Sequence, residues 1–220
     1  FRSRQSLEFL KTLLTTPSPS GFERKGQKVW MDYVKPFADE INTDVYGSVV
    51  ASVNPGAESS IVVAGHSDEI GLMVNHIDDD GFIYVVTIGG IDPAVVPGKR
   101  LTIHTDDGPV LGVTGATAIH LRDKNKSNEN VRQMHELFVD VGATSKDQVV
   151  KKGIKIGDAI TFVDDFEMID KNICVARALD NRIGTWIAAE TLRLIKESKQ
   201  KPKVAVHAAS CVQEEVGLRG

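Results

Sequence analysis

The chain has 220 residues, of which 41% are apolar and 25% are charged, and its formal net charge is −4 with a pI near 5.9. This composition is that of a globular protein large enough to fold without disulfides. It lacks a cluster of basic and aromatic residues, which argues against a nucleic-acid partner. Its apolar runs all fall short of the ~20 residues that span a bilayer. We therefore expect neither nucleic acid nor a membrane as a partner.

Two features of the sequence bear on its compartment. The only cysteines, Cys174 and Cys211, stand in apolar runs, where we expect two buried, reduced thiols rather than a disulfide or a metal site. The N-terminal residues Phe-Arg-Ser-Arg lack the apolar core of a signal peptide. They also lack an initiator methionine, so we expect that at least one end has been trimmed. These features together predict a cytoplasmic protein.

The first part of the chain alternates helical and strand-like patterns. Leucines recur at helical spacing up to the breaker at 17–21 (PSPSG), and a second helical pattern runs through residues 29–37. Residues 45–53 and 60–65 then predict two strands. The second of these is almost wholly apolar, which is typical of a central strand that is covered on both faces.

Residues 75–164 show short strand-like runs broken by Asp-Gly turns, with one helical pattern at 144–152. This pattern predicts a small, β-rich, barrel-like domain inserted into an α/β domain that comprises residues 1–74 and 165–220. Within the insertion, the polar segment 122–136 is predicted to be a mobile loop.

The α/β pattern resumes after the insertion. A short strand is predicted at 173–176, a helix with an apolar stripe at 183–195, and a buried strand at 204–209. The predicted fold class is therefore α/β, with a mixed sheet flanked by helices.

Residues that commonly bind metals follow three of the predicted strands. His66 and Asp68 follow the first of these strands, Asp180 follows a second, and Glu214 with Glu215 follows a third. Sites in open α/β sheets form beyond the carboxyl ends of strands, so we expect these side chains to converge. An imidazole combined with carboxylates suits zinc, cobalt or manganese.

The residue types also suggest a division of roles. The Asp68 carboxylate is placed to accept the second ring N–H of His66 and so to fix its tautomer. Of the adjacent Glu214 and Glu215, one is able to bind metal while the other accepts a proton from a metal-bound water. Asp180 offers two oxygens with which to bridge two metals.

Each of these residues has an ordinary interpretation as well. A single histidine after a strand is usually a core or surface histidine, Asp180 stands where a helix N-cap is expected, and an acidic pair is usually solvated. The metal hypothesis is favoured because three such coincidences would have to occur together at strand ends. The remaining histidines show no ligand spacing: His76, His104, His120, His135 and His207.

Three segments carry a resemblance to a known family. Residues 65–74 (GHSDEIGLMV), 175–184 (VARALDNRIG) and 213–220 (QEEVGLRG) resemble the signature segments of the M42 metallo-aminopeptidases, which include glutamyl aminopeptidases and tetrahedral TET peptidases. Segments 136–149 and 155–162 resemble parts of the family's inserted domain. The resemblance implies a zinc-exopeptidase-like fold and an enzyme that removes N-terminal residues from peptides.

The resemblance also implies a role for each site residue. His66 ligates one of two divalent ions, Asp180 bridges both, and Glu215 ligates the second. Glu214 is the general base, and Asp68 orients His66. The ions are zinc, with cobalt or manganese as alternatives. The bond from Asp180 to the next residue is implied to be cis.

Further implications concern partners and completeness. The resemblance implies peptide substrates with a free N-terminus and a homo-oligomer, commonly a dodecamer, that assembles through the inserted domain. The family pattern continues past the third segment and supplies a further aspartate ligand and a late histidine ligand, whereas this sequence stops at Gly220. A chain that ends there is expected to bind metal weakly and to have little activity.

Two other functions remain open from the sequence. A related dinuclear deacylase acting on N-acyl amino acids would need the same ligands. A non-catalytic assembly subunit would need none of them, and would form a large assembly without bound metal.

Overall fold

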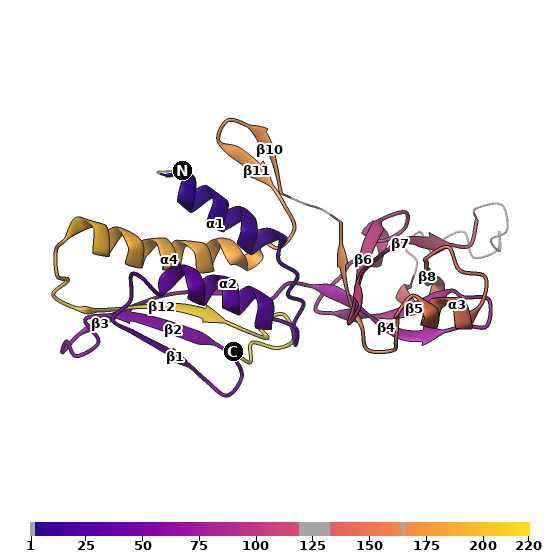
Figure 1. Ribbon diagram of the computed structural model, residues 1–220, viewed down its shortest axis with the longest axis horizontal. Helices are drawn as coiled ribbons and strands as arrows, with labels where there is room; N and C mark the ends of the chain where they lie inside the picture. The colour runs from indigo at the N-terminus through magenta and orange to yellow at the C-terminus, as the bar shows by residue number, and fades with distance from the viewer. Residues whose placement is uncertain (1–2, 119–132, 164–165) are drawn as a thin grey trace. The chain divides into compact units, whose positions relative to one another are not determined.

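The computed structural model describes residues 3–118, 133–163 and 166–220 (Figure 1). The chain forms two compact units, one made of residues 1–69 and 164–220 and the other of residues 70–163. We call them the sheet unit and the barrel unit. The first boundary follows Glu69 rather than Val74, because Leu72 and Val74 are buried in the core of the barrel unit.

The sheet unit is built on a mixed four-stranded sheet. Its strand order is β1-β2-β12-β3, in which β12 runs parallel to β3 and antiparallel to β2. Helices α1, α2 and α4 pack against one another and over one face of this sheet (Figure 1). This arrangement confirms the predicted fold class. The elements are α1 (Arg4–Thr15), α2 (Arg24–Val34), β1 (Glu40–Thr43), β2 (Val49–Val53), β3 (Ser60–His66), α4 (Leu179–Ser198) and β12 (Ala205–Cys211).

The core of the sheet unit lies between the helices and the sheet. Apolar residues at helical spacing meet alternate residues of the strands, as amphipathic elements must if each is to bury one face. Trp30 is fully buried there, and its ring N–H donates to the backbone oxygen of Thr185 at 2.8 Å, which joins α2 to α4. The buried core residues are Phe9, Leu13, Trp30, Val34, Val49, Ala51, Val53, Ala188, Ala189, Leu192, Val206 and Ala208.

The strand predicted at 45–53 begins later than expected, at Val49. The cause is the side chain of Asp44, whose Oδ1 accepts hydrogen bonds from the amides of Tyr46, Gly47 and Ser48 at 2.8–2.9 Å. A carboxylate that captures three successive amides forms a turn and removes those amides from any strand. Val45 is consequently exposed instead of paired.

The prediction of a central, doubly covered strand at 60–65 is wrong for the described residues. The strand exists as β3, but it lies at an edge of the sheet, and Ile61 and Val62 are 55% and 60% exposed. The described helices cover only one face of the sheet, so an apolar composition alone did not establish burial. Only the last two residues of β3, Gly65 and His66, are buried.

The barrel unit is a closed barrel with strand order β4-β5-β8-β7-β6-β9, which confirms the predicted β-barrel insertion. A contiguous apolar core fills it, with Leu72, Ile83, Leu101 and Ile103 fully buried. The elements are β4 (Gly71–Ile77), β5 (Ile83–Ile88), η1 (Pro93–Val95), β6 (Arg100–Thr105), β7 (Gly108–Ala116), η4 (Met134–Glu136), β8 (Leu137–Asp140), α3 (Lys146–Lys151) and β9 (Ala159–Phe162).

Two predictions for the barrel unit have different outcomes. The helix expected at 144–152 is confirmed as α3, which begins after Ser145 because the Ser145 hydroxyl accepts from the amide of Gln148 as an N-cap. Most of the predicted mobile loop at 122–136 lies outside the described residues. Its described end, from Gln133, enters the short helix η4.

A separate two-stranded hairpin precedes α4. It pairs β10 (Glu167–Asp170) with β11 (Ile173–Val175), and neither strand joins the four-stranded sheet. Cys174 in this hairpin and Cys211 in β12 are free, as predicted, but both are half-buried rather than fully buried. Among the helices of the described residues, none combines the length and the apolar composition needed to cross a membrane.

Gly65 permits the close packing of β3 against α4. A Cβ atom at this position would lie 2.5 Å from the backbone nitrogen of Thr185 and 2.6 Å from the carbonyl carbon of Gly184. We predict that Gly65→Ala lowers the free energy of unfolding by about 1–3 kcal/mol, the usual cost of overpacking. Urea unfolding followed by circular dichroism would measure it.

The control is Gly56→Ala, because a Cβ at Gly56 meets no atom within 4 Å. This variant should be neutral or slightly stabilising, by up to about 1 kcal/mol, since it restricts the unfolded chain. Equal stability of the two variants would show that the β3–α4 contact has room to adjust.

Candidate metal centre

The parallel pairing of β3 with β12 brings two of the predicted ligand clusters together. Cys211 pairs with His66 at the carboxyl ends of the two strands. Just beyond, the backbone N–H and the hydroxyl of Ser67 both donate to the backbone oxygen of Cys211, at 2.8 and 3.1 Å. The segment 213–215 therefore follows β12 at the same edge of the sheet at which His66 ends β3.

Asp180 reaches the site by a different route from the predicted one. The strand before it, β11, belongs to the separate hairpin, so the prediction that all three clusters follow strands of one sheet is wrong for Asp180. It is placed instead by the first turn of α4, which packs against β3. The start of α4 lies close to the end of β3, because Gly65 has no side chain to hold the two elements apart.

The start of α4 bears on the interpretation of Asp180 as a helix N-cap. Oδ1 of Asn181 accepts from the amide of Gly184 at 3.1 Å, so Asn181 makes the bond of a helix N-cap. The side chain of Asp180 points to His66 instead. The peptide bond between Asp180 and Asn181 is cis, which confirms that prediction.

Acidic side chains gather around the ring of His66. Its Nε2 lies 3.2 Å from Oδ1 of Asp180 and 3.7 Å from Oε2 of Glu214. His66, Glu214 and Glu215 each offer one ligand atom, and these atoms all lie within 4.8 Å of one another. His66 is buried, whereas Asp180 is exposed. The four residues therefore lie close together, and this set of one nitrogen and several carboxylate oxygens fits a divalent cation of the zinc type.

The carboxylate of Asp68 is fully buried beneath these ligands. It accepts from the hydroxyl of Ser20 at 2.6 Å, and from the amides of Glu214 and Glu215 at 3.1 Å each. Its Oδ1 lies 3.4 Å from Nδ1 of His66, and the backbone oxygen of the same residue lies 3.1 Å from that nitrogen. Asp68 thus holds both the imidazole and the loop that carries the two glutamates.

These contacts shift the pKa of both partners. Burial would raise the pKa of Asp68, but the hydrogen bonds from His66, Ser20 and the two amides outweigh it and lower this pKa to about 2. Burial would lower the pKa of His66, but the hydrogen bond and charge of Asp68 outweigh it and raise this pKa to about 9. Burial, with the neighbouring carboxylates, raises the pKa of Glu215 above its usual value. The cluster therefore favours a positive charge at its centre.

The structure adds residues that the sequence did not single out. One of them is Ser20, which donates to Asp68. Another is Glu23, whose carboxylate accepts from the amides of Gly21 and Gln213 at 2.9 and 3.1 Å and whose pKa is raised by burial. Glu23, the residue just before α2, thereby fixes the start of the 213–215 loop. Its one sequence signal is a Ser-Gly-x-Glu order before a helix, which is too short to be distinguished from an ordinary cap.

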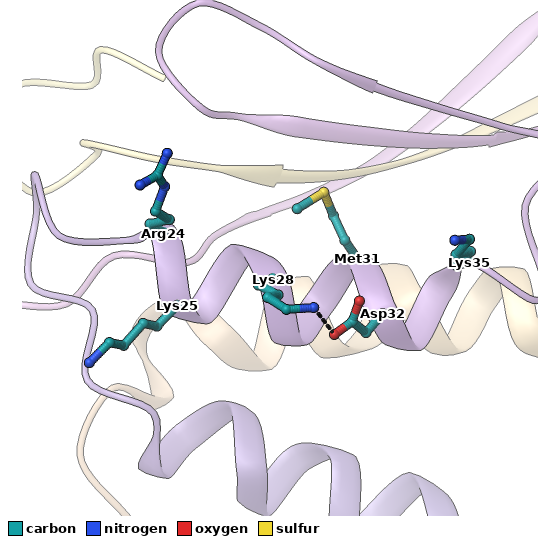
Figure 2. Close-up of a pocket in the computed structure, with 6 residues that line it drawn as sticks. All are labelled: Arg24, Lys25, Lys28, Met31, Asp32 and Lys35. Atoms are coloured by element: carbon teal, nitrogen blue, oxygen red, sulfur yellow. Dashed lines mark hydrogen bonds and ion pairs between the residues drawn. The ribbon is translucent and has the colours of Figure 1, made fainter.

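A hollow of about 560 Å³ lies elsewhere, along the exposed side of α2 (Figure 2). Lys28 and Asp32 form an ion pair across one helical turn at 2.7 Å, and both side chains are more than half exposed. Such a pair is typical of a solvated helix face. The hollow includes none of the ligands around His66; it is lined by Arg24, Lys25, Lys28, Met31, Asp32 and Lys35.

Comparison with known proteins identifies the family of this chain. The family model of the M42 glutamyl aminopeptidases matches residues 47–220, and the chain belongs to this family. A lysyl aminopeptidase of Pyrococcus furiosus is 34% identical over 214 residues, which are 97% of this chain and 60% of that protein.

Solved structures give the same result for the fold. A TET aminopeptidase from the archaeon Thaumarchaeota archaeon SCGC AB-539-E09 matches with a TM-score of 0.95 and 33% identity, over 99% of this chain and 61% of that one. A TET1 peptidase of Pyrococcus horikoshii, described as assembling into a tetrahedron or a large octahedral shell, matches with a TM-score of 0.84 and 31% identity, over 98% and 63%. The chain thus spans about 60% of the length of these relatives.

The raised pKa of His66 predicts how the metal-free chain responds to pH. A group whose pKa is raised on folding adds stability that is complete below its unfolded value of 6.5 and is lost as the pH rises through the folded value of about 9. We predict that the free energy of unfolding falls between pH 6.5 and 9 by an amount of the order of 3 kcal/mol. NMR of the imidazole resonances and urea unfolding at several pH values would measure both effects.

Two histidine variants provide the controls. His66→Gln should lack both the resonance that titrates near pH 9 and the associated loss of stability. His76→Gln should keep both, because His76 is exposed in the barrel unit. A wild-type His66 that titrates below pH 7 would contradict the prediction.

Proposed function

We propose that the sheet unit is the metal-binding part of an aminopeptidase that removes N-terminal residues from peptides with the help of two divalent ions. The observation that carries this proposal is the convergence of His66, Asp180, Glu214 and Glu215, held from below by Asp68. Membership of the M42 family supports it, because relatives such as the Pyrococcus furiosus protein are named as aminopeptidases.

Each residue has a role in this proposal. His66 would ligate one ion, Asp180 would be shared by both ions, and Glu215 would ligate the second. Asp68 accepts a hydrogen bond from Nδ1–H of His66, which would leave the lone pair of Nε2 free to bind an ion. Zinc is the proposed metal, with cobalt and manganese as alternatives that suit the same donors.

Glu214 serves as the general base. Its carboxylate accepts a proton from the water that attacks the first peptide carbonyl, and then returns that proton to the leaving amine. When bound, the two ions supply Lewis acidity toward the carbonyl and lower the pKa of the attacking water. Glu214 is half-buried beside His66, so its carboxylate is accessible to a substrate.

Hydrolysis assays separate this proposal from a metal-dependent deacylase. The complete gene product, loaded with zinc, should release para-nitroaniline from leucyl, glutamyl or lysyl substrates and should leave N-acyl amino acids intact. The reverse preference would assign a deacylase. A large assembly that binds no metal and cleaves neither class would identify a non-catalytic assembly subunit. The cytoplasmic location remains a prediction.

The two adjacent glutamates should differ when each is replaced by glutamine. Glu214→Gln should lower kcat by about 100-fold or more, the usual contribution of a general base, and leave zinc content nearly unchanged. Glu215→Gln should lower zinc content as well as activity, because a ligand is lost. Elemental analysis after dialysis, combined with the hydrolysis assay, measures both. Equal zinc content in the two variants would refute the division of roles.

We further propose that the barrel unit forms contacts between copies of this chain in a homo-oligomer, such as a dodecamer. Leu111 and Val113 alternate along β7 with the buried Gly112 and Thr114, so both project from the outside of the barrel, where they are 59% and 43% exposed. Exposed apolar pairs of this kind favour a protein partner. The assembly described for the Pyrococcus horikoshii relative supports a second copy as that partner.

Replacing Leu111 by glutamate should therefore reduce the mass of the assembly. A charge placed in an apolar contact is costly to desolvate, so the assembly should dissociate to smaller species in analytical ultracentrifugation. Val45→Glu is the control, because Val45 is 98% exposed in a turn of the sheet unit and should leave the mass unchanged. A smaller mass for the control alone would assign the contact to the sheet unit.

A further inference from the structure

Arg182 is a buried cation close to the candidate metal centre. Its side chain is 0% exposed, and its guanidinium makes four short hydrogen bonds. Nε donates to the backbone oxygen of Ser67 at 2.8 Å, and Nη2 donates to Oε1 of Glu69 at 2.9 Å. Nη1 donates to the backbone oxygens of Leu13 and Thr16, at 2.9 and 2.7 Å. One planar group therefore joins α4, the segment after β3 and the end of α1.

Glu69 completes this arrangement from the other side. It is 3% exposed, and its Oε1 also accepts from the amide of Ser18 at 2.9 Å. Its Oε2 accepts from Nε of Arg177 at 2.9 Å, and Nη2 of that arginine donates to the backbone oxygen of Thr15 at 3.0 Å. Both buried charges thus have several partners, which a buried ion pair needs in order to offset its desolvation.

The position of this pair relates it to the ligands. Ser67 lies between His66 and Asp68, and Arg182 lies two residues after Asp180. The bond from Arg182 to Ser67 therefore joins the two segments that carry His66 and Asp180, which are 114 positions apart in sequence. The hydrogen bonds of Arg182 go to Glu69 and to backbone oxygens. Arg182 therefore acts on the site through the backbone that presents His66 and Asp180.

We propose that Arg182 and Glu69 form a positioning clamp, which fixes the distance between the His66 and Asp180 segments and so sets the affinity of the site for metal. The proposal rests on the metal-binding function proposed above. An arginine is required because its fork of fixed donors meets three separate acceptor directions at once, whereas a lysine ammonium cannot span them.

The chain offers a matched control for this clamp. Arg193 lies on the same helix, about 16 Å further along its axis, and is 3% exposed. It pairs with the buried Glu190 at 2.7 Å. Removing either arginine breaks a buried ion pair, so Arg182→Met and Arg193→Met should both lower the melting temperature. Only the first should alter the metal site.

Two measurements on the complete gene product test the proposal. The first is zinc affinity, by competition with a chromophoric chelator. Arg182→Met and Glu69→Gln should each weaken it at least tenfold, as loss of residues that orient ligands usually does, and Arg182→Lys should restore little of it. The second is hydrogen exchange of the metal-free chain, in which amides in 66–69 and 178–185 should exchange at least tenfold faster in both variants. Arg193→Met should leave both readouts as in the wild type.

The outcomes separate the clamp from the proposed function. Unchanged zinc affinity and unchanged exchange in Arg182→Met, or equal losses in Arg193→Met, would overturn the clamp. If Arg182→Met does not fold, Glu69→Gln decides by the same criteria. If the wild-type chain binds no zinc, the metal-binding proposal fails, and the exchange experiment, which needs no metal, still decides whether the clamp joins the two segments.

Discussion

The buried carboxylate of Asp68 is the group on which the candidate site depends. It receives the Ser20 hydroxyl and the amides of Glu214 and Glu215, and it faces Nδ1 of His66. A fully buried charge is stable only when it is well partnered, and each of these partners belongs to a segment that forms the site. The same contacts that satisfy Asp68 therefore fix the positions of the candidate ligands.

Much of this arrangement could be predicted from the sequence, because its ligands stand in short polar segments after apolar strands. His66, Glu214 and Glu215 were found in this way. They meet because β3 and β12 are parallel neighbours, whose carboxyl ends lie at the same edge of the sheet. The same rule singled out Asp180, although Asp180 does not follow a strand of the four-stranded sheet. The residue type was informative, whereas the strand before it belongs to a separate hairpin.

The residues that support the ligands were harder to predict, because their partners are backbone atoms. Glu23 binds the amide of Gln213, and Arg182 binds the carbonyls of Leu13, Thr16 and Ser67. Any residue supplies such atoms, so no pattern of side chains reveals the contact. Arg182 did leave one signal. A basic residue in the first turn of a helix opposes the helix dipole, which suggests that a specific buried partner compensates for it.

Local turns and uncovered surfaces account for the remaining differences between the predicted strands and the observed ones. Asp44 removed four residues from the strand predicted at 45–53, because a short acidic side chain captures neighbouring amides more readily than a partner strand does. For β3, an apolar sequence was taken to mean burial, yet Ile61 and Val62 are exposed in the described residues. Composition identifies a strand, but the elements that pack against it decide its burial.

The location of Glu69 connects the clamp to the organisation of the chain. Glu69 is the last residue of the sheet unit before the barrel unit begins at Ile70. Its carboxylate is held by Ser18, Arg177 and Arg182, all of which belong to the sheet unit. A residue anchored at this point limits how far a displacement of the following chain reaches toward His66 and Asp68. Among the described residues, the contacts that hold His66, Asp180 and the two glutamates lie within the sheet unit.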